Sequence, residues 1–369
     1  MRTLIILLAA LLLGCSWSNP YYDPDKAHHT PEGFRNNYPF VEREMSLQWR
    51  WQQFWRTLPR PTESNARPNP LAADVEVLRA NRNEPTLTWI GHATLLLQVG
   101  GVNVLTDPYF SERASPVSFA GLRRSAPPAL ALDELPPIDV VLISHNHYDH
   151  LDLSALTGLQ TQPGGPPRIF VPLGIEPWLA DEGIRNVVEQ DWWESSEYLG
   201  LRIHLVPAQH DSARGWFDHN RTLWGGFVVE HPLLRFYFAG DTGYTRDFAD
   251  IAERLGPVDL AALPIGGYEP RRFMEAMHMN PAEAVQAHRD LQARYSVAMH
   301  WGTFAMPDEP LGEPPKALAQ ALAESGVPPE RFLVMRLGET RPLSPLLGKP
   351  TAPQAAASPR ERSLARSVY

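Results

Sequence analysis

The chain has 369 residues, of which 43% are hydrophobic, so it can bury the core of one large domain or of two ordinary ones. Its formal charge is −9, and it has no dense Lys/Arg cluster, which argues against nucleic-acid binding. The single cysteine, Cys15, excludes an internal disulfide and a thiolate metal site in the mature protein.

The first residues predict an export signal. Arg2 provides a positive charge, and residues 4–13 form an apolar run too short to cross a bilayer as a helix. The run ends in Leu12-Leu13-Gly14-Cys15, which resembles the lipobox of bacterial lipoproteins, where the cysteine is diacylated and becomes the mature N-terminus. We expect residues 1–14 to be a signal peptide and Cys15 to carry a stable lipid anchor. An ordinary secretory signal is the alternative.

By the same resemblance, Ser16 stands where an Asp would favour retention in the inner membrane. The expected location is therefore the bacterial envelope, at the periplasmic face of the outer membrane. Residues 15–84 predict a tether rich in Pro, Tyr and Asn, interrupted by an amphipathic helix over residues 44–58. The apolar face of that helix includes Trp51, Phe54 and Trp55, and it would either pack on the core or lie among lipid headgroups.

Residues 85–342 predict a single large α/β domain. Strands over 86–90, 94–99 and 102–106 form an opening β-meander, in which Gly100 and Gly101 make one turn. Strands and helical stretches then alternate. Strands are predicted over 140–144, 168–172, 201–207, 222–230, 234–239, 260–265, 295–300 and 332–336, and helices over 246–255, 281–293 and 315–325. Residues 343–369, rich in Ala, Pro, Ser and Arg, predict a disordered tail.

The most informative segment is Ser-His-Asn-His-Tyr-Asp-His-Leu-Asp at residues 144–152, directly after a buried strand. Four potential metal ligands fall within six positions, namely His145, His147, Asp149 and His150. Imidazole and carboxylate ligands suit zinc, iron or manganese. A solvated loop rich in His is the alternative. Asp152 would either orient one of the ligand histidines or cap the following helix.

Three further candidate ligands follow other predicted strands. His210, Asp241 and His300 each lie just beyond a strand's carboxyl end, where sites gather in layered α/β folds. His145, His147 and His210 would hold one ion, Asp149, His150 and His300 a second, and Asp241 would bridge them. Two ions about 3.5–4 Å apart can share a hydroxide and stabilise attacking and leaving oxygens. Gly240 and Gly243 would let the backbone pass close to the ions.

These residues resemble the metallo-β-lactamase superfamily. Longer motifs narrow the resemblance to the enzymes that hydrolyse N-acyl-phosphatidylethanolamine, the phospholipase D type. The motifs are Thr88-Trp89-Ile90-Gly91-His92-Ala93-Thr94, Thr106-Asp107-Pro108, Gly240-Asp241-Thr242-Gly243-Tyr244, Pro264-Ile265-Gly266-Gly267-Tyr268-Glu269-Pro270 and His300-Trp301-Gly302-Thr303-Phe304. The resemblance runs from about Arg35 to about Arg341.

The resemblance implies a four-layer αβ/βα sandwich, two zinc ions, and a membrane phospholipid cleaved to phosphatidic acid and N-acylethanolamine. It makes His278 a catalytic residue that would hydrogen-bond the phosphate, although a surface histidine at a helix start is the alternative. His92 and Asp107 would be buried supports and not ligands, and Tyr268, Glu269 and Arg271 would be weaker pocket candidates. Asp211 departs from the aromatic residue expected after His210.

The expected mechanism is direct hydrolysis, since the sequence lacks a Gly-x-Ser-x-Gly nucleophile elbow. Asp149 and Asp241 would position the attacking hydroxide, and Asp149 or a metal-bound water would protonate the leaving alkoxide. A lactonase, another phosphodiesterase of this superfamily, or a non-catalytic metal-binding envelope protein are the rival interpretations. The acyl preference, the native metal and the oligomeric state, including a homodimer, stay open.

Overall fold

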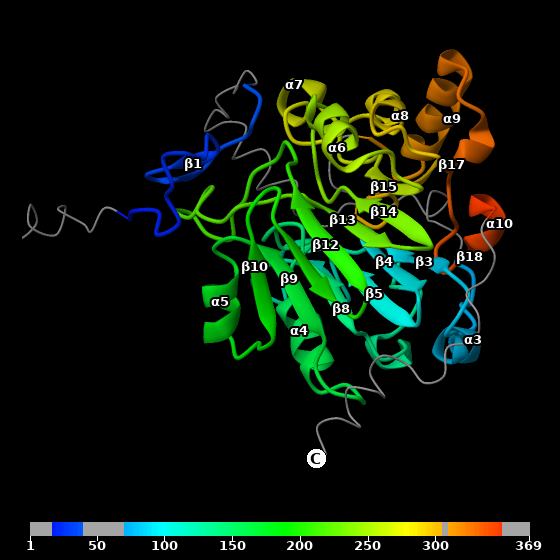
Figure 1. The fold of residues 1–369 in the computed structure, drawn as a ribbon, viewed down its shortest axis with the longest axis horizontal. Coiled ribbons are helices and arrows are strands. Elements are labelled where there is room, and N and C mark those ends of the chain that lie inside the picture. The colour runs from blue at the N-terminus through cyan, green and yellow to red at the C-terminus, as the bar shows by residue number, and fades with distance from the viewer. Residues whose placement is uncertain (1–16, 40–69, 305–308, 349–369) are drawn as a thin grey trace, which may run out of the picture.

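The computed structural model describes residues 17–39, 70–304 and 309–348. Two seven-stranded sheets pack face to face, and helices cover the outer face of each (Figure 1). The four-layer αβ/βα sandwich predicted from the sequence is therefore confirmed.

The first sheet joins an antiparallel meander to three parallel strands. Its order is β10-β9-β8-β5-β4-β3-β18. The strands are β3 (Thr86–Gly91), β4 (Thr94–Val99), β5 (Val102–Thr106), β8 (Val140–Leu142), β9 (Arg168–Pro172), β10 (Val187–Gln190) and β18 (Thr340–Pro342). Its outer helices are α3 (Val75–Ala80), α4 (Leu153–Gln160) and α5 (Glu176–Asp181), shown below the sheet in Figure 1.

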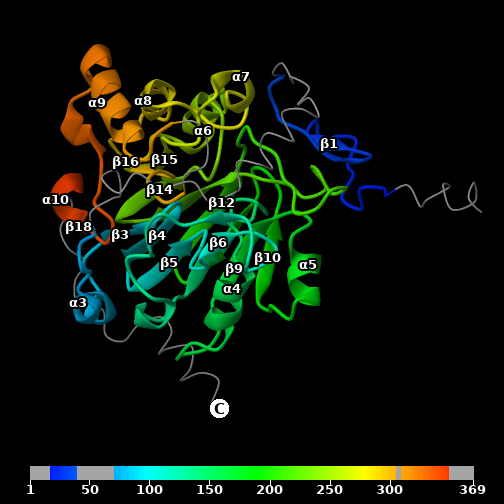
Figure 2. The ribbon, with the colours of Figure 1, turned by 180° about the vertical axis from the view of Figure 1, so that it is seen from behind.

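The second sheet repeats this plan, with the order β11-β12-β13-β14-β15-β16-β17. The strands are β11 (Ser195–Tyr198), β12 (Leu201–Val206), β13 (Gly226–His231), β14 (Leu234–Phe238), β15 (Leu260–Pro264), β16 (Tyr295–Met299) and β17 (Phe332–Leu333). Its outer helices are α6 (Asp247–Leu255), α7 (Arg271–Met274), α8 (Pro281–Asp290) and α9 (Glu313–Ser325), and Figure 2 shows them from behind. Short elements complete the described fold, namely β1 (His29–Thr30), β2 (Gly33–Phe34), β6 (Arg113–Ala114), β7 (Leu122–Arg123) and α10 (Ser344–Leu347).

Side-chain alternation along the central strands builds two cores. On β4, Leu95 and Leu97 enter the core between the sheets, whereas Leu96 faces the core under the helices. Both faces of such a strand are covered, and its sequence is therefore a nearly continuous run of apolar residues. This arrangement fixes the strands rigidly and leaves their carboxyl ends to carry polar side chains at the seam between the sheets.

The predicted tether does not match the described part of residues 15–84. Residues 17–39 pack on the domain, where buried Asp191 accepts hydrogen bonds from His28 (2.7 Å), His29 (2.9 Å) and Lys26 (2.6 Å). Leu78 of α3 is buried in the core under the first sheet. The prediction was wrong for these stretches because their Pro and Asn content concealed a few buried anchor residues.

The boundary of the predicted tail also shifts. Leu343 and Leu347 are buried in the core between the sheets, so the fold continues through α10 instead of ending at residue 342. The predicted signal peptide, Cys15, the helix over residues 44–58 and the tail after residue 348 lie outside the described residues. Within the described ranges, no helix is both long enough and apolar enough to cross a membrane.

Replacing Asp191 tests the docking of the N-terminal segment, residues 17–39. We expect Asp191→Ala to lower the free energy of unfolding by about 3 kcal/mol, since it leaves two buried imidazoles without their acceptor. Urea unfolding and limited proteolysis of the segment would measure this. Glu194→Ala removes a carboxylate that is 52% exposed, lies 3.6 Å from Lys26 and accepts from the amide of Asp191 (3.0 Å), and it should cost only about 1 kcal/mol. Equal losses in the two variants would contradict the anchoring role.

Candidate metal centre

The loop over residues 144–152 presents three histidines to the seam between the sheets. It begins where β8 ends, and Ser144 is fixed at its start by Asp107, which accepts from the Ser144 amide (2.7 Å) and hydroxyl (2.6 Å). The amides of His150 and Leu151 then donate back to the carbonyl of His147, closing a tight turn. Such a turn brings side chains that are close in sequence onto one concave surface.

His145, His147 and His210 form the first group of candidate ligands. His147 Nδ1 lies 2.9 Å from His145 Nε2 and 3.2 Å from His210 Nε2. Nitrogen atoms this close together suit a single cation bound between them. The structure thus brings together the three histidines that the sequence assigned to one ion.

Asp149, His150 and His300 form the second group, with Asp241 against it. Asp241 Oδ2 lies 3.1 Å from His150 Nε2 and 3.0 Å from His300 Nε2. Asp149 Oδ2 is 3.6 Å from His150 Nε2 and 3.8 Å from His300 Nε2. The two groups adjoin, since the rings of His145 and His150 are 4.3 Å apart between centroids.

Several polar atoms of this centre are buried without a hydrogen-bond partner. They are His150 Nε2, His300 Nε2, Asp241 Oδ1 and His278 Nδ1. Unsatisfied buried donors and acceptors are costly, so their convergence needs an occupant. Imidazole and carboxylate donors of this kind fit divalent zinc, iron or manganese. The residues therefore fit the expected two-metal centre.

The electrostatics of the site agree with cation binding. Burial lowers the pKa of His145 well below its usual value and that of His210 to about 4, so both are in the neutral form that binds metals. Burial opposes charge on His300 as well, but Asp241 and Asp149 outweigh it and raise the pKa of His300 to about 9. The same two carboxylates, which stabilise the positive charge on His300, would also stabilise a bound metal cation.

Asp107 and His92 support the second group from behind. Asp107 Oδ2 accepts from His150 Nδ1 (2.6 Å), which aims Nε2 of that ring toward Asp241. His92 Nε2 lies 3.0 Å from Asp149 Oδ2 and holds that carboxylate. Both residues are buried, as the sequence interpretation expected, and each also lies in a group of possible metal ligands, His92 with Asp149, His150 and His300, and Asp107 with His145 and His150. Asp152 instead caps α4, accepting from the amides of Ser154 and Ala155.

The backbone at this end of the sheets is held in unfavourable conformations. His92, Asp107 and His300 have left-handed φ angles of 54°, 30° and 58°. Such angles are uncommon for residues other than glycine and cluster at functional sites. A Cβ atom on Gly240 would lie 2.4 Å from the side chain of Ser144, so this glycine allows two ligand-bearing loops to approach each other. The sequence had assigned it to an approach to the ions.

His278 adjoins both groups of ligands. Its Nδ1 lies 3.8 Å from Asp241 Oδ2, and its ring stacks on that of His300, with centroids 5.4 Å apart. Arg271, which pairs with Glu283, donates to the carbonyl of His278 (2.8 Å) and so positions the residue. Burial lowers the pKa of His278 to about 3, which leaves a neutral imidazole with an unpaired Nδ1.

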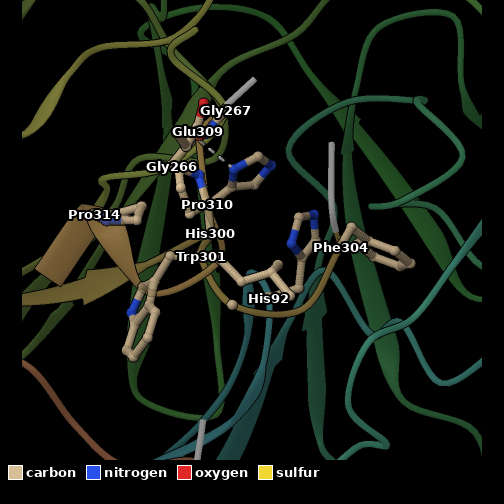
Figure 3. A pocket seen from close by; sticks show the side chains of 11 residues that line it. His92, Gly266, Gly267, His300, Trp301, Phe304, Glu309, Pro310 and Pro314 are labelled. Carbon is tan, nitrogen blue, oxygen red and sulfur yellow. Dashed lines mark hydrogen bonds between the residues drawn. The ribbon is translucent and has the colours of Figure 1, made fainter. Parts of the chain in front are cut away.

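A cavity of about 20 Å³ lies beside His300 and has room for one water molecule (Figure 3). His92, Trp301 and Phe304 line it with Glu309, whose carboxylate accepts from the amides of Gly267 (2.5 Å) and Glu269 (3.0 Å). Glu309 therefore fixes the loop after β15 that carries Gly267 against His278 and His300. No sequence motif singled out this glutamate.

Asn36 is a second residue that sequence reasoning missed. Its side-chain amide donates to the carbonyl of His210 (2.9 Å) and accepts from the amide of His210 (3.0 Å). Through this two-point clamp, the N-terminal segment holds one of the candidate metal ligands in place. No local pattern connects two residues separated by 174 positions, so only the tertiary structure reveals the contact.

The fold and the centre together define the class of protein. Residues 102–301 match the beta-lactamase superfamily domain, and the chain belongs to this superfamily. An isothiocyanate hydrolase from Delia radicum gut bacteria shares the fold, with a TM-score of 0.56 and 21% identity over 72% of this chain and 100% of that one.

Within the superfamily, the chain is similar to N-acyl-phosphatidylethanolamine-hydrolyzing phospholipase D enzymes. It is 47% identical to phospholipase D 1 of this kind from Caenorhabditis elegans over 229 residues, which is 59% of this chain and 64% of that protein. It is 36% identical to the mitochondrial enzyme of Saccharomyces cerevisiae over 262 residues, which is 69% of this chain and 55% of that protein. The matches thus span less than two thirds of either relative. The family and the His/Asp centre make the chain a metal-dependent hydrolase.

The clamp on His210 predicts a specific loss of metal affinity. We expect Asn36→Ala to weaken zinc binding at the three-histidine group roughly tenfold, since residues that orient ligands contribute on this scale. Competition with a chromophoric chelator would measure it. The neighbouring Asn37→Ala removes a hydrogen bond to Asp247 away from the centre and serves as the matched control. Unchanged zinc affinity in Asn36→Ala would refute the clamp.

Proposed function

We propose that the protein is a phospholipase D-type phosphodiesterase that hydrolyses N-acyl-phosphatidylethanolamine to phosphatidic acid and N-acylethanolamine. The observation that carries the proposal is the position of His278, a neutral buried imidazole beside two adjoining groups of metal ligands. The similarity to enzymes named for this reaction supports the same substrate. Water is the attacking group, and the bond between phosphorus and the ethanolamine oxygen breaks.

The proposed cofactor is a pair of zinc ions. Bound ions would supply Lewis-acid polarisation of the phosphate and activation of water at neutral pH. His145, His147 and His210 would hold one ion, and Asp149, His150 and His300 the other, with Asp241 between them. Iron or manganese would satisfy the same donor atoms.

His278 would stabilise the charge that develops on the phosphate. Its neutral ring can donate one hydrogen bond to a non-bridging oxygen, and Arg271 keeps its backbone in place. Because the ring is already buried and stacked on His300, little reorganisation accompanies the reaction. We therefore assign it a catalytic role in the proposed reaction and not that of a ligand, while its ring also lies within reach of an ion shared with Asp241 and His300.

Asp149 and Asp241 would have different roles in the proposed reaction. The side chain of Asp149 is 15% exposed, whereas that of Asp241 is 2% exposed. The more accessible carboxylate can take a proton from the attacking water and return one to the leaving alkoxide. Asp241, shielded between His150 and His300, would serve to hold the two ligand groups together.

Delivery of a substrate that stays in a bilayer would depend on attachment to the membrane. We propose that Cys15 carries the lipid anchor at the periplasmic face of the outer membrane, and that the helix over residues 44–58 adds an interfacial contact. Metabolic labelling with a radioactive fatty acid would test the anchor. A protein with Cys15→Ser should remain unlabelled.

Product analysis on vesicles that contain N-acyl-phosphatidylethanolamine tests the function. We expect release of N-acylethanolamine, and a decrease in kcat of about 100- to 1,000-fold in His278→Ala at unchanged metal content. His231→Ala, at the turn between β13 and β14, is the matched control and should keep full activity.

Two results would contradict parts of the proposed function. If phosphatidylethanolamine or a lactone were hydrolysed and the N-acylated lipid were not, the metal centre would still be supported, but its substrate would be a different one. Loss of zinc in His278→Ala would make this residue a ligand and contradict the role proposed for it.

A further inference from the structure

The loop over residues 211–221 carries two aromatic side chains at its tip. Trp216 is 90% exposed and Phe217 is 86% exposed, and they are the most exposed large apolar side chains among the residues that the structure describes. Single exposed apolar residues are common, but an adjacent Trp-Phe pair that projects from the surface leaves a large apolar area in water. Such a pair indicates an interaction surface.

The loop is fixed firmly on the metal centre. Arg214 donates to the carbonyls of Asn146 (2.8 Å) and Leu151 (3.1 Å), both on the loop that carries His145, His147 and His150. Its guanidinium also stacks on the rings of Tyr148 and Trp178, at 4.1 and 4.6 Å from their centroids. The position of the aromatic tip is thus tied to that of the ligands.

The tip itself is closed by Asp218. Its carboxylate accepts from the amides of Arg214 (3.1 Å) and Gly215 (2.8 Å), and so folds the chain back around Trp216 and Phe217. These bonds satisfy the backbone within the turn. The two aromatic rings are therefore presented outward by an ordered turn, and their exposure follows from the way the loop is built.

The base of the loop touches the three-histidine group. Asp211 directly follows the ligand His210, and its Oδ1 lies 3.7 Å from His147 Nε2. Its other oxygen lies 3.1 Å from Nε2 of the exposed His219. The loop that carries the aromatic tip thus begins directly after a candidate metal ligand and contacts a second one at its base.

The described N-terminal segment begins at the same edge of the molecule as this loop. Trp17 stacks on Arg221, whose guanidinium carbon is 4.8 Å from the centroid of the Trp17 ring. Both ribbon views show this blue segment, with β1, beside the green loops at one edge of the molecule (Figures 1 and 2). Cys15 precedes Trp17 by two residues, so at most roughly 7 Å of extended chain separates the proposed attachment point from Trp17.

We propose that Trp216 and Phe217 form a membrane-docking tip that inserts among the headgroups and upper acyl chains of a lipid bilayer. This proposal rests on the proposed function, because it supplies the surface from which the metal centre would reach a lipid substrate. A bilayer suits the pair better than a folded partner does. The tip is convex, and Trp and Phe favour the membrane interface. It also lies beside the point where the predicted anchor enters.

Vesicle binding by the full chain carrying Cys15→Ser tests the tip without the anchor. The vesicles would contain phosphatidylethanolamine and phosphatidylglycerol in equal parts, and co-sedimentation would give the partition coefficient. We expect Trp216→Ala/Phe217→Ala to weaken binding by about tenfold or more, since each ring can bury roughly 150–250 Å². Val77→Ala, which removes an apolar side chain that is 58% exposed on α3, is the control and should bind normally.

A second readout locates the inserted residue. Phospholipids brominated on their acyl chains should quench the fluorescence of the Cys15→Ser protein, and this quenching should fall in Trp216→Phe while vesicle affinity is largely kept. Zinc content, the thermal midpoint and hydrolysis of water-soluble bis(p-nitrophenyl) phosphate should be unchanged in all variants, which shows that each is folded and active.

The outcomes separate this proposal from the proposed function. Vesicle affinity within twofold of the parent in the double variant would overturn the docking tip, and so would an equal loss in Val77→Ala. If the tip then binds a protein from the envelope, the surface is a protein interface instead. Normal vesicle binding that depends on the tip, without release of N-acylethanolamine, would retain the docking surface and reject the substrate.

Discussion

The structure depends on the burial of charged and polar groups at the seam between the two sheets. Asp107 and Asp241 are buried there with His150 and His300, in surroundings where an unpaired charge is very unfavourable. Hydrogen bonds offset part of this cost, namely the bond from His150 to Asp107 and the bond from His92 to Asp149. Other buried polar atoms have no hydrogen-bond partner, above all Asp241 Oδ1, His150 Nε2 and His300 Nε2, so their desolvation cost is not offset. Bound metal ions would satisfy these atoms, and the strained backbone at His92, Asp107 and His300 lies at the same place.

The N-terminal segment connects a second buried polar cluster, around Asp191, to the candidate metal centre. Asp191 fixes the segment through Lys26, His28 and His29, and the segment in turn places Asn36 on His210. From His210 the chain continues into the loop that carries Trp216 and Phe217. The route from the N-terminus to the metal centre and on to the aromatic tip is thus short in space although it covers some 200 residues of sequence. The proposed anchor, the ligands and the proposed membrane-docking tip would therefore act as one unit.

The sequence predicted most of the strands and singled out the His and Asp side chains that the structure brings together, and the physical reason is local. β4, β5 and β9 match their predicted bounds because each is an apolar run flanked by turn residues, and the ligands follow strand ends, where a short polar motif is conspicuous. Helix α5 was missed, and α4 was expected only in the alternative in which Asp152 caps a following helix, because each is short and is defined by packing more than by its own pattern. Asn36, Glu309 and the anchoring of Asp191 could not be predicted, because each acts on residues distant in sequence. Asp211 was noticed as a departure from a motif, but its contacts with His147 and His219 required the structure.

A crystal structure of the zinc-loaded protein, with anomalous diffraction recorded at the zinc edge, tests the two-metal centre most directly. We predict two anomalous peaks per chain, about 3.5–4 Å apart. One peak should be bound by His145, His147 and His210, the other by Asp149, His150 and His300, and Asp241 should contact both. One peak alone, or ions bound elsewhere while the buried atoms at the seam stay unpaired, would contradict the two-metal centre.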